Sequence, residues 1–164
     1  MRRVILCLLC PILLLGCAKL SQNVYHGDYF SAALPEPFEP VADSSVICFA
    51  PYGDPLLSSS VTFSATERNW YFDSFTEEEY EESLKALCGY ESLKVVRFEQ
   101  RHVGGYDARR IACKVSVDQG VHDLIIYAVN ADRTYLFTLL NRDSDDYISA
   151  FDSMISTVRF TEGA

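Results

Sequence analysis

The histidines of this 164-residue chain are the first residues to consider for acid–base or metal chemistry. They number three, His26, His102 and His122, and no two of them have the spacing of a metal-binding pair. The sequence contains no HExxH motif, no GxSxG nucleophile motif and no GxGxxG phosphate loop. We therefore expect that the protein is not an enzyme and that it holds no metal and no other cofactor.

Three cysteines beyond the N-terminal segment could do thiol chemistry: Cys48, Cys88 and Cys113. Because their number is odd, at least one of them has no disulfide partner within the molecule. Cys113 is one of the inward-facing residues of a predicted strand, and Cys88 lies on the apolar side of a predicted helix. The simplest interpretation is that these cysteines are buried and act as small hydrophobic residues. An oxidising compartment would permit one disulfide, which could be either Cys48–Cys113 or Cys88–Cys113. No base is evident beside any of the three thiols.

One aromatic cluster, formed by Trp70, Tyr71, Phe72 and Phe75, lies outside any clear predicted element. A loop that packs beneath the following helix explains it most simply. The functional alternative is an exposed contact surface for a partner, because large aromatic side chains are enriched in such surfaces.

The first sixteen residues have the composition of an export signal. Two arginines precede an apolar run from Val4 to Leu15 that contains Pro11. The run has about a dozen residues, whereas a membrane-spanning helix needs ~20, and a proline is poorly tolerated in so short a helix. The segment therefore predicts a cleaved secretory signal.

The end of this segment, Leu14-Leu15-Gly16-Cys17, resembles the lipobox of bacterial lipoproteins. The resemblance implies that Cys17 receives a thioether-linked diacylglyceryl group and becomes the mature N-terminus, where two or more acyl chains hold a protein stably on a bilayer. The alternative is an ordinary secretory signal followed by a coincidental cysteine. We expect a signal peptide at 1–16, a lipidated tether at 17–27 and one globular domain at 28–164, on the extracytoplasmic side of a bacterial cell membrane.

The net charge limits the partners of the mature chain. Without residues 1–16 it carries 12 basic and 23 acidic residues, a net charge of −11. Nucleic acid and anionic lipid headgroups would be repelled by such an excess. The composition favours a soluble monomer, a cationic partner, or no charged partner at all, and a solubilising surface explains the acidic excess most simply.

Hydrophobic periodicity predicts the elements that position these residues. Strands are expected at 28–34, 46–50, 60–66, 93–103, 106–117, 121–130, 134–141 and 157–160. A capping box of Thr76 and Glu79 begins a helix that ends at Gly89, and Asp143 or Ser144 caps a second helix.

The connections and the strand composition together predict the architecture. The strands from 93 to 141 are joined by short turns, which permit only antiparallel neighbours. The segments Leu124–Val129 and Tyr135–Leu140 are apolar nearly throughout, so both of their faces must be buried. With two amphipathic helices available, we expect an α+β fold in which an antiparallel sheet has helices packed on both faces, a three-layer sandwich.

This order of elements resembles the PsbP-like fold, which extrinsic proteins of photosystem II share with a Ran-binding nuclear import factor and bacterial lipoproteins of the DcrB type. The segments that carry the resemblance are GGYDARRIACKVSV (104–117), TYLFTLLNR (134–142), YISAFDSMISTVRF (147–160) and the opening DYFSAALPEPF (28–38). The resemblance implies a fold and no active site, because members of the fold have unrelated functions.

The anchor, the short tether and the missing catalytic motifs together predict a non-catalytic accessory or protein-interaction module. Its expected partners are the lipid bilayer, through the acyl chains on Cys17, and another envelope protein. One alternative is a small-ligand-binding lipoprotein, whose pocket the aromatic cluster and a sheet edge would form. An unrecognised hydrolase is the last alternative.

Overall fold

The computed structural model describes residues 23–42, 46–53, 59–69, 72–88, 90, 92–118, 120–142 and 147–161. In chain order, the elements are β1 (Asn23–His26), β2 (Phe30–Leu34), β3 (Phe38–Pro40), β4 (Ile47–Pro51), β5 (Ser60–Thr66), α1 (Glu77–Cys88), β6 (Leu93–Val103), β7 (Tyr106–Val117), β8 (Gly120–Asn130), β9 (Thr134–Asn141), α2 (Ile148–Ser156) and β10 (Arg159–Phe160). The strands form two antiparallel sheets, so the predicted α+β class is confirmed.

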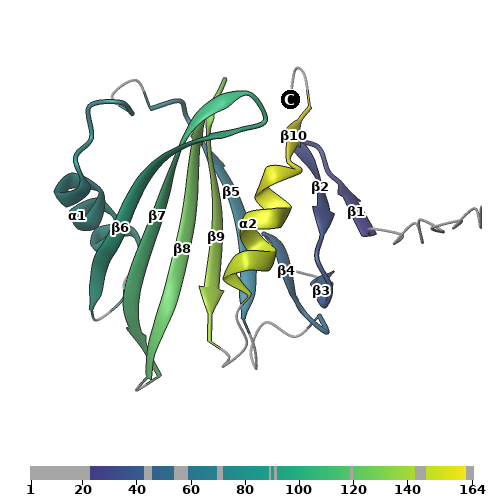
Figure 1. Ribbon diagram of the computed structural model, residues 1–164, viewed down its shortest axis with the longest axis horizontal. Helices are drawn as coiled ribbons and strands as arrows, with labels where there is room; N and C mark the ends of the chain where they lie inside the picture. The colour runs from purple at the N-terminus through teal and green to yellow at the C-terminus, as the bar shows by residue number, and fades with distance from the viewer. Residues whose placement is uncertain are drawn as a thin grey trace, which may run out of the picture.

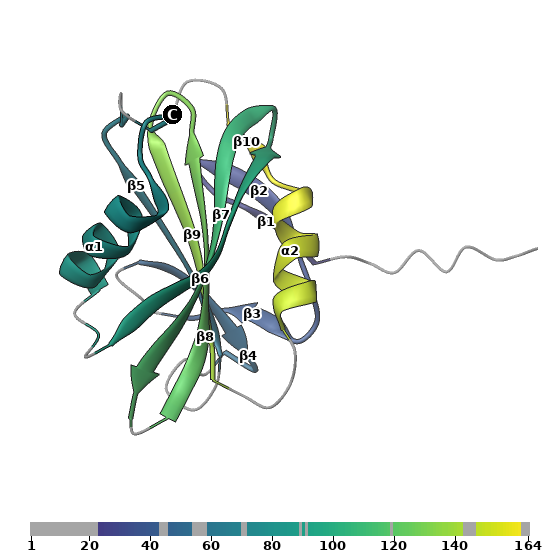
Figure 2. The same ribbon diagram turned by 60° about the vertical axis from the view of Figure 1, so that its left-hand side comes forward.

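The larger sheet has the order β3-β4-β5-β9-β8-β7-β6, and the smaller sheet has the order β1-β2-β10 (Figure 1). The two helices lie on opposite sides of the larger sheet, and the smaller sheet lies on the α2 side (Figure 2). One face is therefore covered by a helix and the other by a helix together with a second sheet. This is the three-layer arrangement that the two-sided apolar strands require.

The α2 side of the larger sheet is closed by aromatic side chains. Phe30 of β2 lies 4.7 Å from the Phe63 ring of β5 and 5.0 Å from the Phe137 ring of β9, measured between centroids. Phe160 of β10 stacks on Tyr135 of β9 at 4.8 Å. Because these contacts join strands of different sheets, they fix the smaller sheet against the larger one.

The α1 side is covered less completely. In β8 every residue from Leu124 to Val129 is buried, as predicted. In β9, however, Tyr135 and Phe137, which face α2, are buried, whereas Leu136, which faces α1, is only half-buried. The reason is that α1 makes its main contacts with β6, at the far edge of the sheet.

The N-terminal cap of α1 agrees with the prediction, whereas the predicted cap of α2 lies outside the described residues. The capping box of α1 is present: the Glu79 N–H donates to Thr76 Oγ1 at 3.3 Å, and the Thr76 N–H donates to Glu79 Oε2 at 2.8 Å. The N-cap of α2 is Tyr147, which makes no side-chain capping bond. The predicted caps, residues 143 and 144, and the predicted stop, residue 89, lie outside the described residues.

Two short strands were not predicted. β1 occupies residues that the sequence analysis gave to the tether, and β3 follows β2 without a predicted strand. Three of the four residues of β1 are exposed, and Tyr25 alone packs inward, at 5.0 Å from the Phe49 ring. Edge strands this short carry too few alternating residues to give a period-2 pattern. The stretch between Cys17 and the first strand is therefore residues 17–22.

Glu81 attaches α1 to the edge strand β6. Its Oε2 accepts the Val95 N–H at 2.9 Å, next to the point where the β6–β7 register shifts between Val95 and Arg97. Its Oε1 accepts a hydrogen bond from Lys85 at 2.6 Å. The hydrogen bond from Lys85 and that from the Val95 backbone hold the pKa of Glu81 below its ordinary value of 4.5. The carboxylate thus satisfies a backbone N–H of the edge strand, beside the bulge.

We predict that Glu81→Ala accelerates amide hydrogen exchange at Val95, whereas Glu81→Gln, which keeps an oxygen acceptor, preserves most of the protection. Because the pKa of Glu81 is lowered in the folded protein, the charge stabilises the fold above pH 4.5, and this contribution is lost as the pH falls through the folded pKa. Exchange measured by NMR across that window checks both statements. Equal exchange in all three proteins would mean that Glu81 does not hold the edge.

Candidate functional site

The β6–β7 hairpin carries a group of basic side chains on the sheet face that is turned toward α2. Paired residues of antiparallel strands share a face, and here Arg97 pairs with Ala112, Glu99 with Arg110 and Lys94 with Lys114. We call five side chains of this face the basic face: Lys94, Arg97, Arg101, Arg110 and Lys114. α2 makes its main contacts with β2 and β9, so the outer part of this hairpin lies beside the helix (Figure 1).

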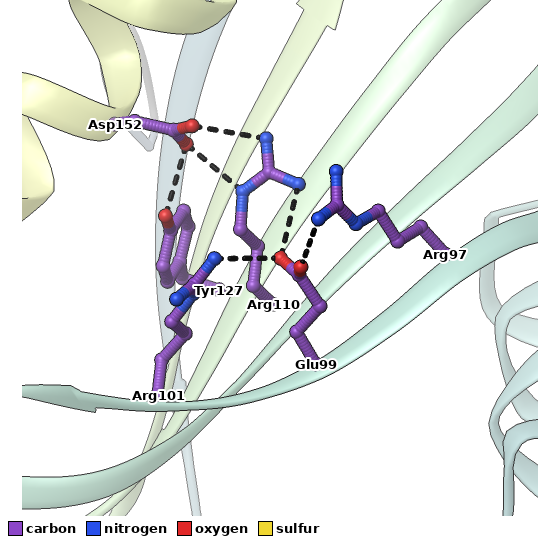
Figure 3. Close-up of polar contacts among 6 residues, drawn as sticks. All are labelled: Arg97, Glu99, Arg101, Arg110, Tyr127 and Asp152. Carbon is purple, nitrogen blue, oxygen red and sulfur yellow. Dashed lines mark hydrogen bonds and ion pairs between the residues drawn. The ribbon is translucent and has the colours of Figure 1, made fainter.

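Glu99 lies at the centre of the basic face and is shared by three guanidinium groups (Figure 3). Arg97 Nη2 lies 2.6 Å from its Oε1, and Arg101 Nη2 lies 2.9 Å from its Oε2. Arg110 Nη1 approaches the same Oε2 at 3.7 Å. One carboxylate therefore orders three cations and neutralises the charge of only one.

Arg110 connects this cluster to α2. Its Nε and Nη2 donate to the two carboxylate oxygens of Asp152 at 3.1 and 3.0 Å, and the Tyr127 hydroxyl donates to Asp152 Oδ1 at 2.9 Å (Figure 3). Burial raises the pKa of Tyr127 to about 12, and the hydrogen bond to Asp152 adds to the effect, so the phenol remains a donor. Burial opposes the charge of Arg110, but the hydrogen bond and the charge attraction to Asp152, with smaller contributions from Tyr127, together outweigh it and raise the guanidinium pKa. The side chain of Arg110 is only 9% exposed and that of Asp152 is 36% exposed, so the pair is partly buried.

The remaining donors of the basic face are open to solvent. The side chains of Arg97 and Arg101 are 67% and 50% exposed. Lys94 lies directly opposite Lys114, which is paired with Asp123 at 2.6 Å. Five basic residues therefore meet three acidic ones, Glu99, Asp123 and Asp152, on a chain that is strongly acidic as a whole. Such a face can bind a carboxylate or phosphate through guanidinium forks.

The predicted aromatic cluster is only partly described. Trp70 and Tyr71 lie outside the described residues, as does the predicted lipidation site Cys17. Phe72 is 1% exposed and lies beneath the Arg109 guanidinium, whose carbon is 5.0 Å from the ring centroid. Phe75 is half-buried, with its ring 5.3 Å from that of Tyr80. Phe72 is therefore buried, as the preferred interpretation of a packed loop requires, and is not part of an exposed contact surface.

Strand order rules out one of the two possible disulfides. Cys48 lies on β4 and Cys113 on β7, with β5, β9 and β8 between them. Four strand spacings of ~4.8 Å separate the two cysteines by roughly 19 Å, whereas disulfide-bonded Cα atoms lie about 4.4–6.8 Å apart. Both side chains are buried, and burial raises the pKa of the Cys48 thiol. The side chain of Cys88, at the end of α1, lies outside the described residues, so Cys88–Cys113 stays a prediction.

The histidines do not come together. His102 lies on β6 with its Nε2 3.0 Å from Asp107 Oδ1, whereas His26 lies on β1 and His122 on β8. Within the described part of the chain, no group of three His, Cys, Asp or Glu side chains could hold a metal ion. Neither described helix is long and apolar enough to cross a membrane.

The sequence analysis missed the basic face, although the sequence contains a signal for it. Arg97, Glu99 and Arg101 alternate along one predicted strand and therefore share a face. The predicted turn at 104–105 fixes the hairpin register, which places Arg110 opposite Glu99. What could not be anticipated was that α2 would bring Asp152 to the same point.

A scan against protein-family models finds no match to the sequence, and neither does a search of the curated proteins. Solved structures do match. CyanoP, the cyanobacterial PsbP of Synechocystis sp. PCC 6803, superimposes with a TM-score of 0.62 at 16% identity, covering 89% of this chain and 96% of CyanoP.

Two bacterial proteins have the same fold. LpqN, described as involved in cell envelope biogenesis of Mycobacterium tuberculosis, gives a TM-score of 0.54 at 11% identity, covering 80% of this chain and 83% of LpqN. PA94 from Pseudomonas aeruginosa, described as a putative regulator of unknown function, gives 0.52 at 15% identity, covering 83% of this chain and 94% of PA94. At these identities the likeness establishes a PsbP-like fold, as the sequence resemblance implied, and nothing about function.

We predict that Asp152→Ala lowers the free energy of unfolding by about 2–3 kcal/mol, because it leaves the Arg110 charge buried without its main partner. The loss is smaller than for a fully buried pair because Asp152 is partly exposed and Glu99 remains nearby. Denaturant unfolding measures it. The control, Asp107→Ala, breaks the exposed pair with His102 and should cost about 0.5 kcal/mol or less. Equal losses in the two variants would mean that water solvates Arg110.

Proposed function

We propose that the protein is a lipid-anchored extracytoplasmic lipoprotein, and that it acts as a non-catalytic accessory module whose basic face binds an acidic segment of another envelope protein. The observation that carries the proposal is the sharing of Glu99 by Arg97, Arg101 and Arg110, which leaves positive charge and donors on an open sheet face. The PsbP-like fold, which CyanoP and the envelope protein LpqN also have, is compatible with such a role.

The position of the basic face relative to the proposed anchor supports a protein partner. The strand nearest the anchor, β1, packs on the β4 half of the larger sheet through Tyr25 and Phe49. β6 forms the opposite edge of that sheet, and β1 and β6 lie toward opposite ends of the long axis (Figure 1). Residues 17–22 extend at most ~20 Å. A bilayer at the β1 end would thus leave the basic face available to another protein.

The charge distribution favours a short acidic segment over a large polyanion. Away from the basic face, the mature chain is even more acidic than its net charge of −11. An extended anionic surface would meet that charge and be repelled. A short segment that bears a few carboxylates can instead contact Arg97 and Arg101 alone, by the bidentate geometry that a guanidinium offers a carboxylate.

The anchor is tested by expressing the full chain in a bacterial host. We expect purified mature protein to begin at Cys17 and to carry a fatty acyl mass there, and Cys17→Ser to lose membrane association. Cys7→Ser, within the proposed signal peptide, is the matched control and should leave both unchanged. Mass spectrometry of the N-terminal peptide decides the outcome. A mature N-terminus at another residue, or an unacylated Cys17, would refute the anchor.

The partner surface is tested with a photocrosslinker at Val121, an exposed residue next to the basic face. We expect crosslinks in cells to an acidic peptide of an envelope protein, reduced severalfold by Arg97→Glu combined with Arg101→Glu. Arg133→Glu combined with Arg159→Glu makes the same change in net charge elsewhere and should retain the crosslinks.

The competing ligand is an anionic lipid surface. Sedimentation with phosphatidylglycerol vesicles, using the soluble domain from Asn23, separates the two cases. Vesicle binding that depends on Arg97 and Arg101, without an acidic crosslinked peptide, would contradict the proposed protein partner. Crosslinks of equal yield in the two charge-reversed proteins would contradict the role of the basic face.

A further inference from the structure

A cavity of about 230 Å³ lies between α1 and the sheet, on the face opposite the basic face. Its walls come from the loop that precedes α1, from α1 itself and from strands β8 and β9. The apolar part of the lining consists of Phe72, Phe75, Tyr80, Leu84, Ala128 and Leu136. The cavity is thus built mainly from apolar side chains, as small-molecule sites in proteins are.

The cavity follows from how the sheet is covered. α1 makes its main contacts with β6, whereas the cavity floor lies on β8 and β9, one and two strands beyond β7. At the floor, Ala128 pairs with Leu136, so one of the two facing side chains is a single methyl group. A larger residue in place of Ala128 would fill the space. Within the described part of the chain, the side chains of Phe75, Tyr80 and Leu136 are therefore left only half-buried.

Tyr80 lines this site together with the polar residues Asn69, Ser83 and Thr134. Its ring lies between those of Phe75 and Phe98, at 5.3 Å from each centroid. Its hydroxyl is buried and, among the described residues, has no hydrogen-bond partner. A buried hydroxyl without a partner destabilises a fold, so an acceptor placed in the cavity would recover the lost interaction.

We propose that this cavity binds a small neutral molecule, an aromatic ring or short aliphatic chain that bears one carbonyl oxygen, and that the oxygen accepts a hydrogen bond from Tyr80. The volume limits the size, because a cavity of ~150 Å³ holds benzene and drug-sized ligands need about 300–1,000 Å³. A molecule of roughly 8–10 heavy atoms lies between these limits.

The charges around the cavity favour a neutral ligand with an acceptor. Burial raises the pKa of Tyr80 to about 12, so its phenol keeps its proton at neutral pH and can donate a hydrogen bond. The nearby Arg109 guanidinium is already paired with Asp73 at 3.0 Å, so it does not offer a full positive charge to a carboxylate. A carbonyl oxygen meets the phenol donor without a buried charge.

Acetophenone and ethylbenzene are suitable probes because they have similar size and differ in the carbonyl oxygen. We expect acetophenone to bind the domain from Asn23 more tightly than ethylbenzene, with saturable NMR shifts at Tyr80 and Ser83. Tyr80→Phe should lower the affinity for acetophenone about fivefold, because one hydrogen bond contributes ~1 kcal/mol. The affinity for ethylbenzene should change by no more than about twofold. Tyr106→Phe, on the exposed hairpin, is the matched control and should change neither affinity.

Two further measurements complete the test: binding by a variant whose cavity is filled by a larger side chain, and the melting temperature of the Tyr80 variant. Ser83→Trp, at an exposed position of α1 that lines the cavity, should abolish binding of both probes. Tyr80→Phe should melt at the same temperature as the parent or higher, because it removes a buried hydroxyl without a partner. Absence of binding by both probes would overturn the proposal. Equal affinities of the two probes for the parent protein would also overturn it, even if a variant failed to fold.

Discussion

Burial of both faces of strand β8 is the constraint on which the rest of this structure depends. Every residue from Leu124 to Val129 is buried, so the two sides of the larger sheet must both be covered by other parts of the chain. The hydrophobic contribution scales with the apolar area removed from water, at about 25 cal/mol per Å². The described part of the chain offers two helices and a three-stranded sheet as cover, with α1 on one side and α2 and the smaller sheet on the other.

The two faces of the larger sheet are covered to different extents, and this difference creates the features that could bind another molecule. On the α2 side, aromatic rings from both sheets interlock and leave Arg110 as the buried polar connection between β7 and α2. A buried ion pair contributes little net stability, but it tolerates few alternative positions of the helix, which fixes α2 in place. On the other side, α1 is held at the sheet edge by Glu81, and Leu136 of β9 is left only half-buried.

Much of the fold could be predicted from the sequence because long strands with a buried face give a clear period. The bounds of β5, β6, β7 and β9 follow directly from apolar alternation and turn residues. β1 and β3 could not be found in this way, since strands of four and three residues at sheet edges carry almost no periodic signal. The candidate site around Arg110 could not be predicted because it depends on tertiary packing. Glu99 and Asp152 are 53 positions apart, and only the packing of α2 on the sheet brings both to Arg110.

Adjacent residues of β7 point to opposite faces of the larger sheet. A small domain can therefore carry a charged site on one face and an apolar site on the other. Side chains alternate along a strand, so Arg109 points to the α1 side, where it covers Phe72, and Arg110 points to the α2 side, where it bonds Asp152. The strand that carries them is paired along its length with β6 and β8, so it cannot shift toward either face without breaking a ladder. Proteins that are only 11–16% identical to this chain have the same fold. The fold therefore supplies a rigid support, and function has to be sought in the side chains that the support presents.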